Sequence, residues 1–416
     1  MELRKYKLAD IGKVITGKTP STSIVENYAW GTIPFYTPED VAKGLGMMGR
    51  NSRFISKTGF EEIASNTISG ESVLVGCIGS DMGNVAYSNI TCATNQQINA
   101  ITQFKNGIEP LYVYYLLSTM KSYFQKIAGS TTTPILPKSV FEEIEIHLPG
   151  MKKQKDVVSI LYALDRKIEL NKQINDNLEA MAKQLYDYWF VQFDFPNEEG
   201  KPYKSSGGAM AWNEKLKREI PQGWKAVLLK ELATTSRNAI TPVENKMYQH
   251  FSIPSYDTCG SYSLDNGADI RSDKFVLQEG QLLVSKLNPW FNRVIWVPKG
   301  TNMIGSTEFV VLNPNNETES GYIYSIIKSP KFIAYCSQAA TGTSHSQRRV
   351  APDVLMAFKV AYESNIVQKY SSFVEKIQKQ QAELLSEIAV LTKQRDELLP
   401  LLMNGQATVN YHLSDD

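Results

Sequence analysis

Residues 156–190 read DVVSILYALDRKIELNKQINDNLEAMAKQLYDYWF, and this stretch decides the fold. Its apolar residues are spaced mostly by three and four, which places them on one narrow stripe of a helix. They are Val157, Leu161, Leu164, Ile168, Ile174, Leu178, Met181, Leu185 and Trp189. No Gly or Pro interrupts the segment before Pro196. It therefore predicts one helix of roughly 50 Å with a coiled-coil-like seam.

A second segment with the same kind of stripe begins at Ile366. Its apolar residues are Tyr370, Phe373, Ile377, Leu384, Ile388, Leu391, Leu398 and Leu402. Two such helices can bury their stripes against each other, and antiparallel pairing would hold two globular units apart. The alternative is that each helix packs only on its own domain, as amphipathic helices usually do.

The parts of the chain that precede the two helices resemble each other. GESVLVGCIGS from Gly70 aligns with GQLLVSKLNPW from Gly280, an offset of 280 − 70 = 210 residues. AGSTTTPILPKSVFEEIEIHLP likewise matches ATGTSHSQRRVAPDVLMAFKVA. A repeat this long exceeds the unit of a solenoid, so it indicates two domains of one kind.

Within each repeat, short apolar runs bounded by Gly, Asn and Pro predict the strands of a mixed sheet. YVYYLLSTMKSYFQKIA and YIYSIIKSPKFIAYCSQA each predict one helix on that sheet. The predicted fold class is α+β, with two similar mixed α/β domains joined by two long helices that form an antiparallel coiled coil. The predicted boundaries are 1–151 for the first domain, 152–195 for the central helix, 196–222 for an exposed linker, 223–362 for the second domain, 363–405 for the C-terminal helix and 406–416 for a tail.

The charge of the chain is balanced, with a formal net charge of +1. Residues 1–151 hold thirteen basic and thirteen acidic side chains, and residues 222–365 hold fourteen and twelve. DNA-binding domains are usually basic, because phosphate neutralisation supplies most of their non-specific affinity. Any contact with DNA must therefore come from local patches or from partner proteins.

The composition indicates a cytoplasmic protein. No apolar run approaches the ~18 residues of a membrane span, and the opening MELRKYKLAD lacks the apolar core of a signal peptide. The four cysteines have no CxxC pair and no histidine at ligand spacing. We interpret them as small buried side chains in a reducing compartment, and we expect no metal site or disulfide.

Two motifs suggest catalysis, and we reject both. GKVITGKT at Gly12–Thr19 matches the phosphate-binding loop pattern, but a half-charged segment precedes it and Pro20 follows where a helix should begin. NPWF at Asn288–Phe291 is similar to the flipped-adenine loop of amino-methyltransferases, yet it lacks the second proline and an accompanying glycine-rich cofactor loop. We also find no histidine or carboxylate constellation, and we expect a non-enzymatic chain.

Several strings along almost the whole chain resemble the specificity subunits of type I restriction–modification systems. KLADIGKVITGKTPS, IPFYTPEDV and GESVLVGCIGSDMGNVAYS are similar to parts of that family's target recognition domains. KKQKDVVSILYALDRKIELNKQINDNLEAMAKQLYDYWFVQFDFP closely resembles its central spacer helix. The single motifs are loose, but their order and duplication make the match specific.

The resemblance implies a non-catalytic subunit that binds double-stranded DNA. It implies assembly with two adenine methyltransferase subunits, with restriction and motor subunits as further partners. Each recognition domain would read one half of a bipartite, asymmetric target, and the paired helices would set the gap. No cofactor is expected in this chain, and S-adenosylmethionine is expected on the methyltransferase partner.

Base edges are read by Arg, Lys and small polar side chains on rigidly held loops. The alternative for each such position is a solvated turn, which is the default for a polar loop. In the first domain the candidates are Lys18, Thr19, Ser21, Tyr36, Thr37, Ser80, Asn84, Asn95, Gln96, Thr131, Thr132 and Lys138. In the second they are Lys286, Asn288, Trp290, Asn292, Arg293, Thr307, Thr343, Ser344, His345, Ser346, Gln347, Arg348 and Arg349. Gln347, Arg348 and Arg349 lie in the densest donor cluster.

The end of the central helix carries four aromatic residues within five positions: Tyr186, Tyr188, Trp189 and Phe190. They exceed what one helical seam can bury, so we predict a docking surface for the methyltransferase. The alternative is that they serve only the intramolecular coiled coil. For the chain as a whole, the rival hypothesis is a structural adaptor whose two domains bind protein rather than DNA.

Overall fold

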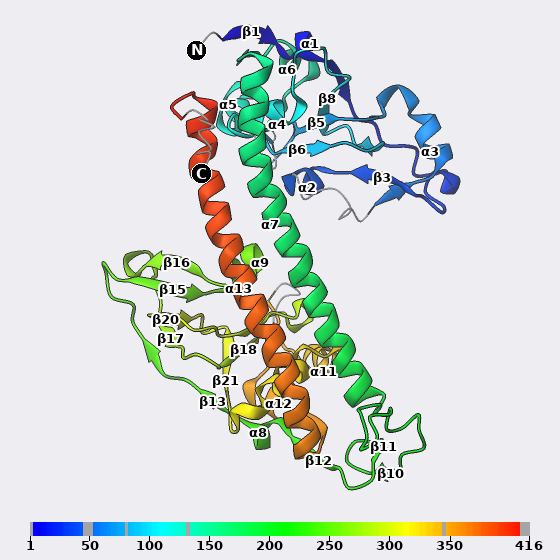
Figure 1. The fold of residues 1–416 in the computed structure, drawn as a ribbon, viewed down its shortest axis with the longest axis vertical. Coiled ribbons are helices and arrows are strands. Elements are labelled where there is room, and N and C mark those ends of the chain that lie inside the picture. Colours follow the sequence, from blue (N-terminus) through cyan, green and yellow to red (C-terminus); the bar gives the residue numbers. More distant parts are fainter. Residues whose placement is uncertain (1–2, 45–52, 80–81, 130–133, 343–346, 408–416) are drawn as a thin grey trace, which may run out of the picture. The chain divides into compact units, whose positions relative to one another are not determined.

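The computed structural model describes residues 3–44, 53–79, 82–129, 134–342 and 347–407. The chain divides into two compact units (Figure 1). Unit 1 consists of Met1–Leu170 with Ala389–Asp416, and unit 2 consists of Asn171–Ile388. Each long helix therefore contributes to both units.

Unit 1 is built on a four-stranded antiparallel sheet with the order β2-β8-β5-β6. Its strands are β2 (Lys13–Thr16), β8 (Ile98–Thr102), β5 (Ser72–Gly76) and β6 (Val85–Ser88). A second sheet has the order β4-β3-β7, with β3 and β7 parallel: β4 (Phe54–Ile55), β3 (Ile33–Tyr36) and β7 (Ala93–Thr94). β1 (Arg4–Lys7) pairs antiparallel with β9 (Glu145–Leu148) and so joins the two ends of the domain.

Both faces of the central sheet are buried. Val73 and Val75 of β5 point into one apolar cluster, and Leu74 between them points into another. This alternation follows from the two-residue period of a strand. Helix α4 packs against β5 and β6 (Figure 1). The helices of unit 1 that precede α7 are α1 (Leu8–Ile11), α2 (Pro38–Val41), α3 (Lys57–Glu62), α4 (Pro110–Ser118), α5 (Lys121–Ile127) and α6 (Lys138–Glu142).

Unit 2 repeats this plan. Its antiparallel sheet has the order β13-β21-β18-β19: β13 (Ala233–Ser236), β21 (Phe309–Pro314), β18 (Leu282–Ser285) and β19 (Val294–Trp296). Leu282 and Val284 of β18 face one cluster and Leu283 faces the other, as in β5. β12 (Lys225–Leu228) pairs antiparallel with β22 (Lys359–Tyr362), as β1 does with β9. The predicted duplication is therefore visible in strand order, direction and burial.

The second sheet is larger in unit 2, where five strands have the order β14-β17-β20-β15-β16. They are β14 (Ala239–Ile240), β17 (Lys274–Val276), β20 (Met303–Gly305), β15 (Met247–Phe251) and β16 (Ser263–Asn266). β15 and β20 are parallel, like β3 and β7. The helices that precede α13 are α8 (Leu229–Leu232), α9 (Ile253–Cys259), α10 (Ser320–Lys328), α11 (Pro330–Ala339) and α12 (Pro352–Met356).

The prediction of one helix on each sheet is wrong in its length, because both segments break into two. In unit 2, Pro330 ends α10 and begins α11, and the Ser329 hydroxyl caps the new helix by accepting from the Phe332 amide. Pro is tolerated in the first turn of a helix and not within one, so the break could have been read from SPKF. In unit 1 the break falls at Thr119–Met120 between α4 and α5.

The long helices are α7 (Met151–Tyr186) and α13 (Ser364–Met403). In unit 2 the Asn171 amide donates to Glu387 at 2.8 Å, and the Tyr370 hydroxyl to the Ala182 carbonyl at 3.4 Å. As residue numbers rise along α7, the numbers of their partners in α13 fall, so the two helices pair antiparallel. In unit 1 they are joined by an ion pair of 3.0 Å between Arg395 and Asp165. The predicted antiparallel coiled coil is confirmed.

The helices also pack on the domains, as the alternative interpretation stated. Val157 and Leu161 of α7 belong to the main core of unit 1. Val367 and Val374 of α13 belong to the main core of unit 2. Each helix therefore buries its stripe on two sides, against the other helix and against a sheet domain.

The predicted linker, residues 196–222, contains structure that the sequence did not reveal. β10 (Met210–Asn213) and β11 (Arg218–Pro221) form an antiparallel hairpin. The Tyr203 ring stacks on Phe195 with centroids 4.8 Å apart, and the Arg218 guanidinium lies 4.3 Å from the Phe193 ring centroid. This segment is thus attached to the core of unit 2 by aromatic contacts.

Candidate nucleic-acid interface

Loops from distant parts of the sequence meet beside the carboxyl end of β5 in unit 1. The Cys77 amide donates to the Gln97 carbonyl at 2.8 Å, and the Leu136 amide donates to the Cys77 carbonyl at 2.9 Å. The Gly79 amide donates to the Pro134 carbonyl at 3.2 Å. We call residues 17–21, 77–79, 82–84, 95–97 and 134–138 the interface loops of unit 1.

Residues 17–21 join this group through Gly17 and Thr19. The Gly17 amide donates to the Ile98 carbonyl at 3.0 Å, and the Thr19 hydroxyl donates to the Gln96 side-chain oxygen at 2.9 Å. A Cβ atom at Gly17 would lie 2.1 Å from the Thr94 hydroxyl oxygen, so only glycine permits this approach. Lys18 is carried beside them with an exposed side chain.

The remaining predicted residues of unit 1 are less available. Tyr36 is fully buried, and burial raises the pKa of its phenol to about 12, so its side chain is part of the core and not of the surface. The Thr37 hydroxyl donates to the Asp40 carboxylate at 3.0 Å, and the Lys121 ammonium donates to the Asn84 side-chain oxygen at 2.7 Å. The others lie as follows: Ser21 with its hydroxyl 2.8 Å from that of Ser23, Asn95 donating to Gln97, and Lys138 3.5 Å from Glu142.

Unit 2 assembles its loops with the same backbone hydrogen bonds. The Lys286 amide donates to the Glu308 carbonyl at 2.8 Å, and the Val350 amide donates to the Lys286 carbonyl at 3.1 Å. Lys286 thus takes the place of Cys77, and Glu308 that of Gln97. The offset here is 286 − 77 = 209 residues, so the sequence alignment of Gly70 with Gly280, at 210, is wrong by one residue along β5 and β18. We call residues 286–293, 306–308, 341–342 and 347–349 the interface loops of unit 2. The exposed Thr307 lies in the second of them.

The arginines of unit 2 differ in what they contact. Arg349 donates from Nε and Nη2 to the Glu308 carboxylate, each at 3.0 Å. Arg293 donates from the same two atoms to the Asp257 carboxylate of α9, at 2.6 and 2.9 Å. The Arg348 backbone is fixed by Asn288, whose side-chain oxygen accepts from its amide at 3.0 Å. Among the residues that the structure describes, the Arg348 guanidinium has no hydrogen-bond or ion-pair partner. Gln347 beside it is exposed.

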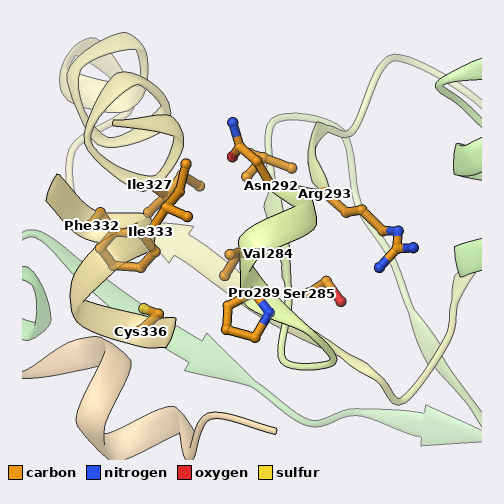
Figure 2. A pocket seen from close by; sticks show the side chains of 10 residues that line it. Val284, Ser285, Pro289, Asn292, Arg293, Ile327, Phe332, Ile333 and Cys336 are labelled. Carbon is orange, nitrogen blue, oxygen red and sulfur yellow. The ribbon is translucent and has the colours of Figure 1, made fainter. Parts of the chain in front are cut away.

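The turn η6 (Pro289–Phe291) lies above a small hollow in unit 2 (Figure 2). The hollow is lined by Val284, Ser285, Pro289, Asn292, Arg293, Val294, Ile327, Phe332, Ile333 and Cys336. Asn292 and Arg293 leave the turn in different directions, Asn292 toward Ile327. The apolar lining indicates that this hollow seats the turn on α10 and α11 and is not itself a ligand site.

The rejected phosphate-binding motif does not have the geometry that phosphate binding requires. Its middle residues, Lys13–Thr16, form strand β2, whereas the loop must connect a strand to a helix. NPWF forms the turn η6, which is tied to Arg348 at one end. In the described ranges, no three His, Cys, Asp or Glu side chains are grouped as a metal site. No described helix has the length and apolarity of a membrane span.

The aromatic residues at the end of α7 are mostly inside unit 2. Trp189 and Phe190 are each 4% exposed, and the Phe190 ring centroid lies 4.5 Å from that of Tyr322. Tyr186 packs on the same core. Only Tyr188, at 38%, offers a large exposed surface. Not one helical seam but α10, α13 and the segment after α7 together bury these rings, which is why the prediction of an exposed aromatic cluster is wrong for Tyr186, Trp189 and Phe190.

Some predicted residues lie outside the described ranges, and two supporting residues were not predicted. Ser80, Thr131, Thr132, Thr343, Ser344, His345 and Ser346 lie outside the described residues. Asp257 and Phe291, in contrast, were missed although both support the loop at 286–293. Asp257 lies 36 residues from Arg293 in the sequence, and no motif links them.

Residues 2–180 match a family model described as the type I restriction modification DNA specificity domain. The MjaIX specificity subunit of Methanocaldococcus jannaschii is 28% identical over 97% of this chain and 93% of its own length. The HindI specificity subunit of Haemophilus influenzae is 32% identical over 43% of this chain and 39% of its own length.

The solved type I restriction–modification S subunit from M. genitalium has the same fold, with a TM-score of 0.60 and 14% identity over 97% of this chain and 96% of that one. The relatives are named as specificity subunits of type I restriction enzymes, and the matching family model is described as a DNA specificity domain. The alternative of a non-DNA adaptor finds no support among them.

Proposed function

The chain belongs to the family of type I restriction–modification specificity subunits, and on this premise we propose that each of its units reads one half of a bipartite DNA target. The observation that carries the proposal is the repeated loop framework. In both units, polar loops gather at the carboxyl end of the corresponding strand of the antiparallel sheet. This strand is β5 in unit 1 and β18 in unit 2. Rigidly held loops of this kind are what base reading requires.

The reading side chains would be those of the interface loops that form no ion pair among the described residues. In unit 1 these are Lys18 and the pair Thr19 and Gln96. In unit 2 they are Lys286, Gln347 and Arg348, and Arg348 can bind the O6 and N7 acceptors of a guanine. Because these sets differ, the two halves of the target should differ in sequence.

In the proposed complex the chain supplies specificity without catalysis. Two adenine methyltransferase subunits would supply the chemistry and bind S-adenosylmethionine, and restriction and motor subunits would be further partners. Half-sites read from one face of B-DNA lie near a helical turn apart, ~34 Å. The paired helices α7 and α13 would set this spacing, and Tyr188 is the exposed aromatic residue for methyltransferase docking.

Partner proteins also account for the balanced charge of the chain. Phosphate neutralisation supplies a large share of the affinity of most DNA-binding proteins. A net charge of +1 provides little of it. The methyltransferase subunits would therefore contribute phosphate contacts, while this chain contributes base contacts.

The test is to co-express the chain with the adenine methyltransferase encoded beside it and to map methylated adenines across the host genome. We expect a split motif that is absent when the methyltransferase is expressed alone. Exchange of residues 223–362 for those of a relative should change one half of the motif only. Methylation that is indifferent to this chain would refute the proposal.

A further inference from the structure

The turn η6 of unit 2 exposes two neighbouring aromatic side chains. Trp290 is 41% exposed and Phe291 is 56% exposed. Their ring centroids lie 6.0 Å apart with the planes inclined by 47°. Large apolar side chains at a loop tip contribute little to the core, so their exposure calls for another explanation.

The turn is held at every side. At its start, the Asn288 amide donates to the Arg348 carbonyl at 2.7 Å, and the Asn288 side chain accepts in return. At its end, the Asn292 amide side chain donates to the Lys328 carbonyl of α10 at 3.5 Å. Arg293 is paired with Asp257, and its guanidinium carbon lies 4.5 Å from the Phe291 ring centroid.

The backbone that frames the turn is also unusual. Asn288 and Asn292 both have a left-handed conformation, with φ of 49° and 51°. Non-glycine residues take this conformation at a cost in energy, and Asn does so more readily than most. Several interactions thus fix two aromatic rings in an exposed position.

The turn belongs to the interface loops of unit 2. Lys286 precedes it by three residues in the chain, and Arg348 is hydrogen-bonded to Asn288, the residue just before the turn. Basic donors beside rigid apolar side chains are the composition of proteins that insert a wedge between stacked bases and kink the duplex. Arg348, whose guanidinium has no partner among the described residues, adds beside the two rings a donor that can bind a base edge.

We propose that Trp290 and Phe291 form a wedge that unstacks a base step within the half-target read by unit 2. This inference rests on the proposed function and adds that unit 2 distorts its DNA. Unit 1 has GSDMG at residues 79–83, after the equivalent strand, and this segment contains no aromatic residue. The distortion should therefore be confined to one half of the target.

The test uses the complex of this chain with its methyltransferase and a duplex that carries the motif mapped from the methylated genome. 2-Aminopurine, whose fluorescence rises when it is unstacked, is placed at successive positions of both halves, away from the adenines that are methylated. We expect a severalfold rise at one step in the unit 2 half and none in the unit 1 half.

The double variant Trp290→Ala/Phe291→Ala should abolish the rise, and Trp290→Phe should retain part of it. The matched control is Trp212→Ala, because Trp212 is an exposed tryptophan of the same unit on the hairpin β10–β11. It should leave the signal unchanged. Melting curves of the variants check that unit 2 remains folded.

Three outcomes decide the matter. A rise that depends on the two aromatic residues supports the wedge. Specific binding and methylation without any rise, or with a rise that survives the double variant, would overturn the wedge and leave the proposed function standing. A methylome without a split motif would refute both the wedge and the proposed function.

Discussion

Units 1 and 2 use the same backbone framework and different side chains to hold it. Gly76 and Ser285 donate to the carbonyls of Asn84 and Arg293, at 2.9 and 3.0 Å, so these positions correspond. In unit 1 the side-chain links between the interface loops are neutral, as in Thr19 to Gln96. In unit 2 they include an ion pair, Arg349 to Glu308, beside the neutral bond from the Arg348 amide to the Asn288 side chain.

The difference shows which interactions are shared and which can vary. Main-chain hydrogen bonds do not depend on the identity of the side chain, so they preserve the framework while the sequence changes. Cys77 and its counterpart Lys286 illustrate this. The Cys77 thiol is buried, which raises its pKa to about 12, whereas Lys286 is a half-buried cationic side chain. The surface can diverge while the framework stays the same.

The largest expected effect is on the stability of the central strands. Leu74 of β5 and Leu283 of β18 are both fully buried and occupy matching positions. Leu74→Ala and Leu283→Ala should each lower the free energy of unfolding of their own unit by about 2–5 kcal/mol, because each leaves a cavity. Denaturant unfolding measures this. A cost below about 1 kcal/mol for either one would contradict the equivalence of the two strands.

A second test asks whether Arg348 discriminates between bases in the unit 2 half of the target only. Arg348→Ala should weaken discrimination at one base pair of the unit 2 half by ~1–3 kcal/mol, since a bidentate contact to guanine would be lost. Competition binding with single-base variants of the motif gives this value. Arg349→Ala is the matched control, because its guanidinium is already held by Glu308. Loss of discrimination in the unit 1 half would refute the assignment.

The smallest expected effect concerns the ion pair itself. Double-mutant cycles between Arg349 and Glu308 should give a coupling energy below about 1 kcal/mol that declines as salt is added, because both side chains are partly exposed. The same cycle between Thr19 and Gln96 should give a value that does not depend on salt. Equal salt dependence in the two units would show that their loops are not held by different means.

The features that could be predicted from the sequence depend on periodic patterns. The stripes that run through Leu161 and Tyr370 identified the two long helices and their pairing. The offset between Gly70 and Gly280 identified the duplication. Each of these signals extends over many residues, so single exceptions do not obscure it.

The features that were missed depend on single contacts between distant residues. The clamp of Asp257 on Arg293 and the burial of Trp189 arise only when the chain is folded. The hairpin at 210–221 has strands of four residues, too short for a periodic signal. The break at Pro330 is different, because its cause is local and a stricter reading of proline would have found it.

The strand pairs β1–β9 and β12–β22 have an evolutionary consequence. In each, the first strand of a domain lies beside its last, so the segment between them starts and finishes at one place. Domains whose ends are adjacent can be replaced without disturbing the rest of a chain. Recombination at the two boundaries of such a segment would exchange one sheet domain in one genetic event, with the rest of the chain kept.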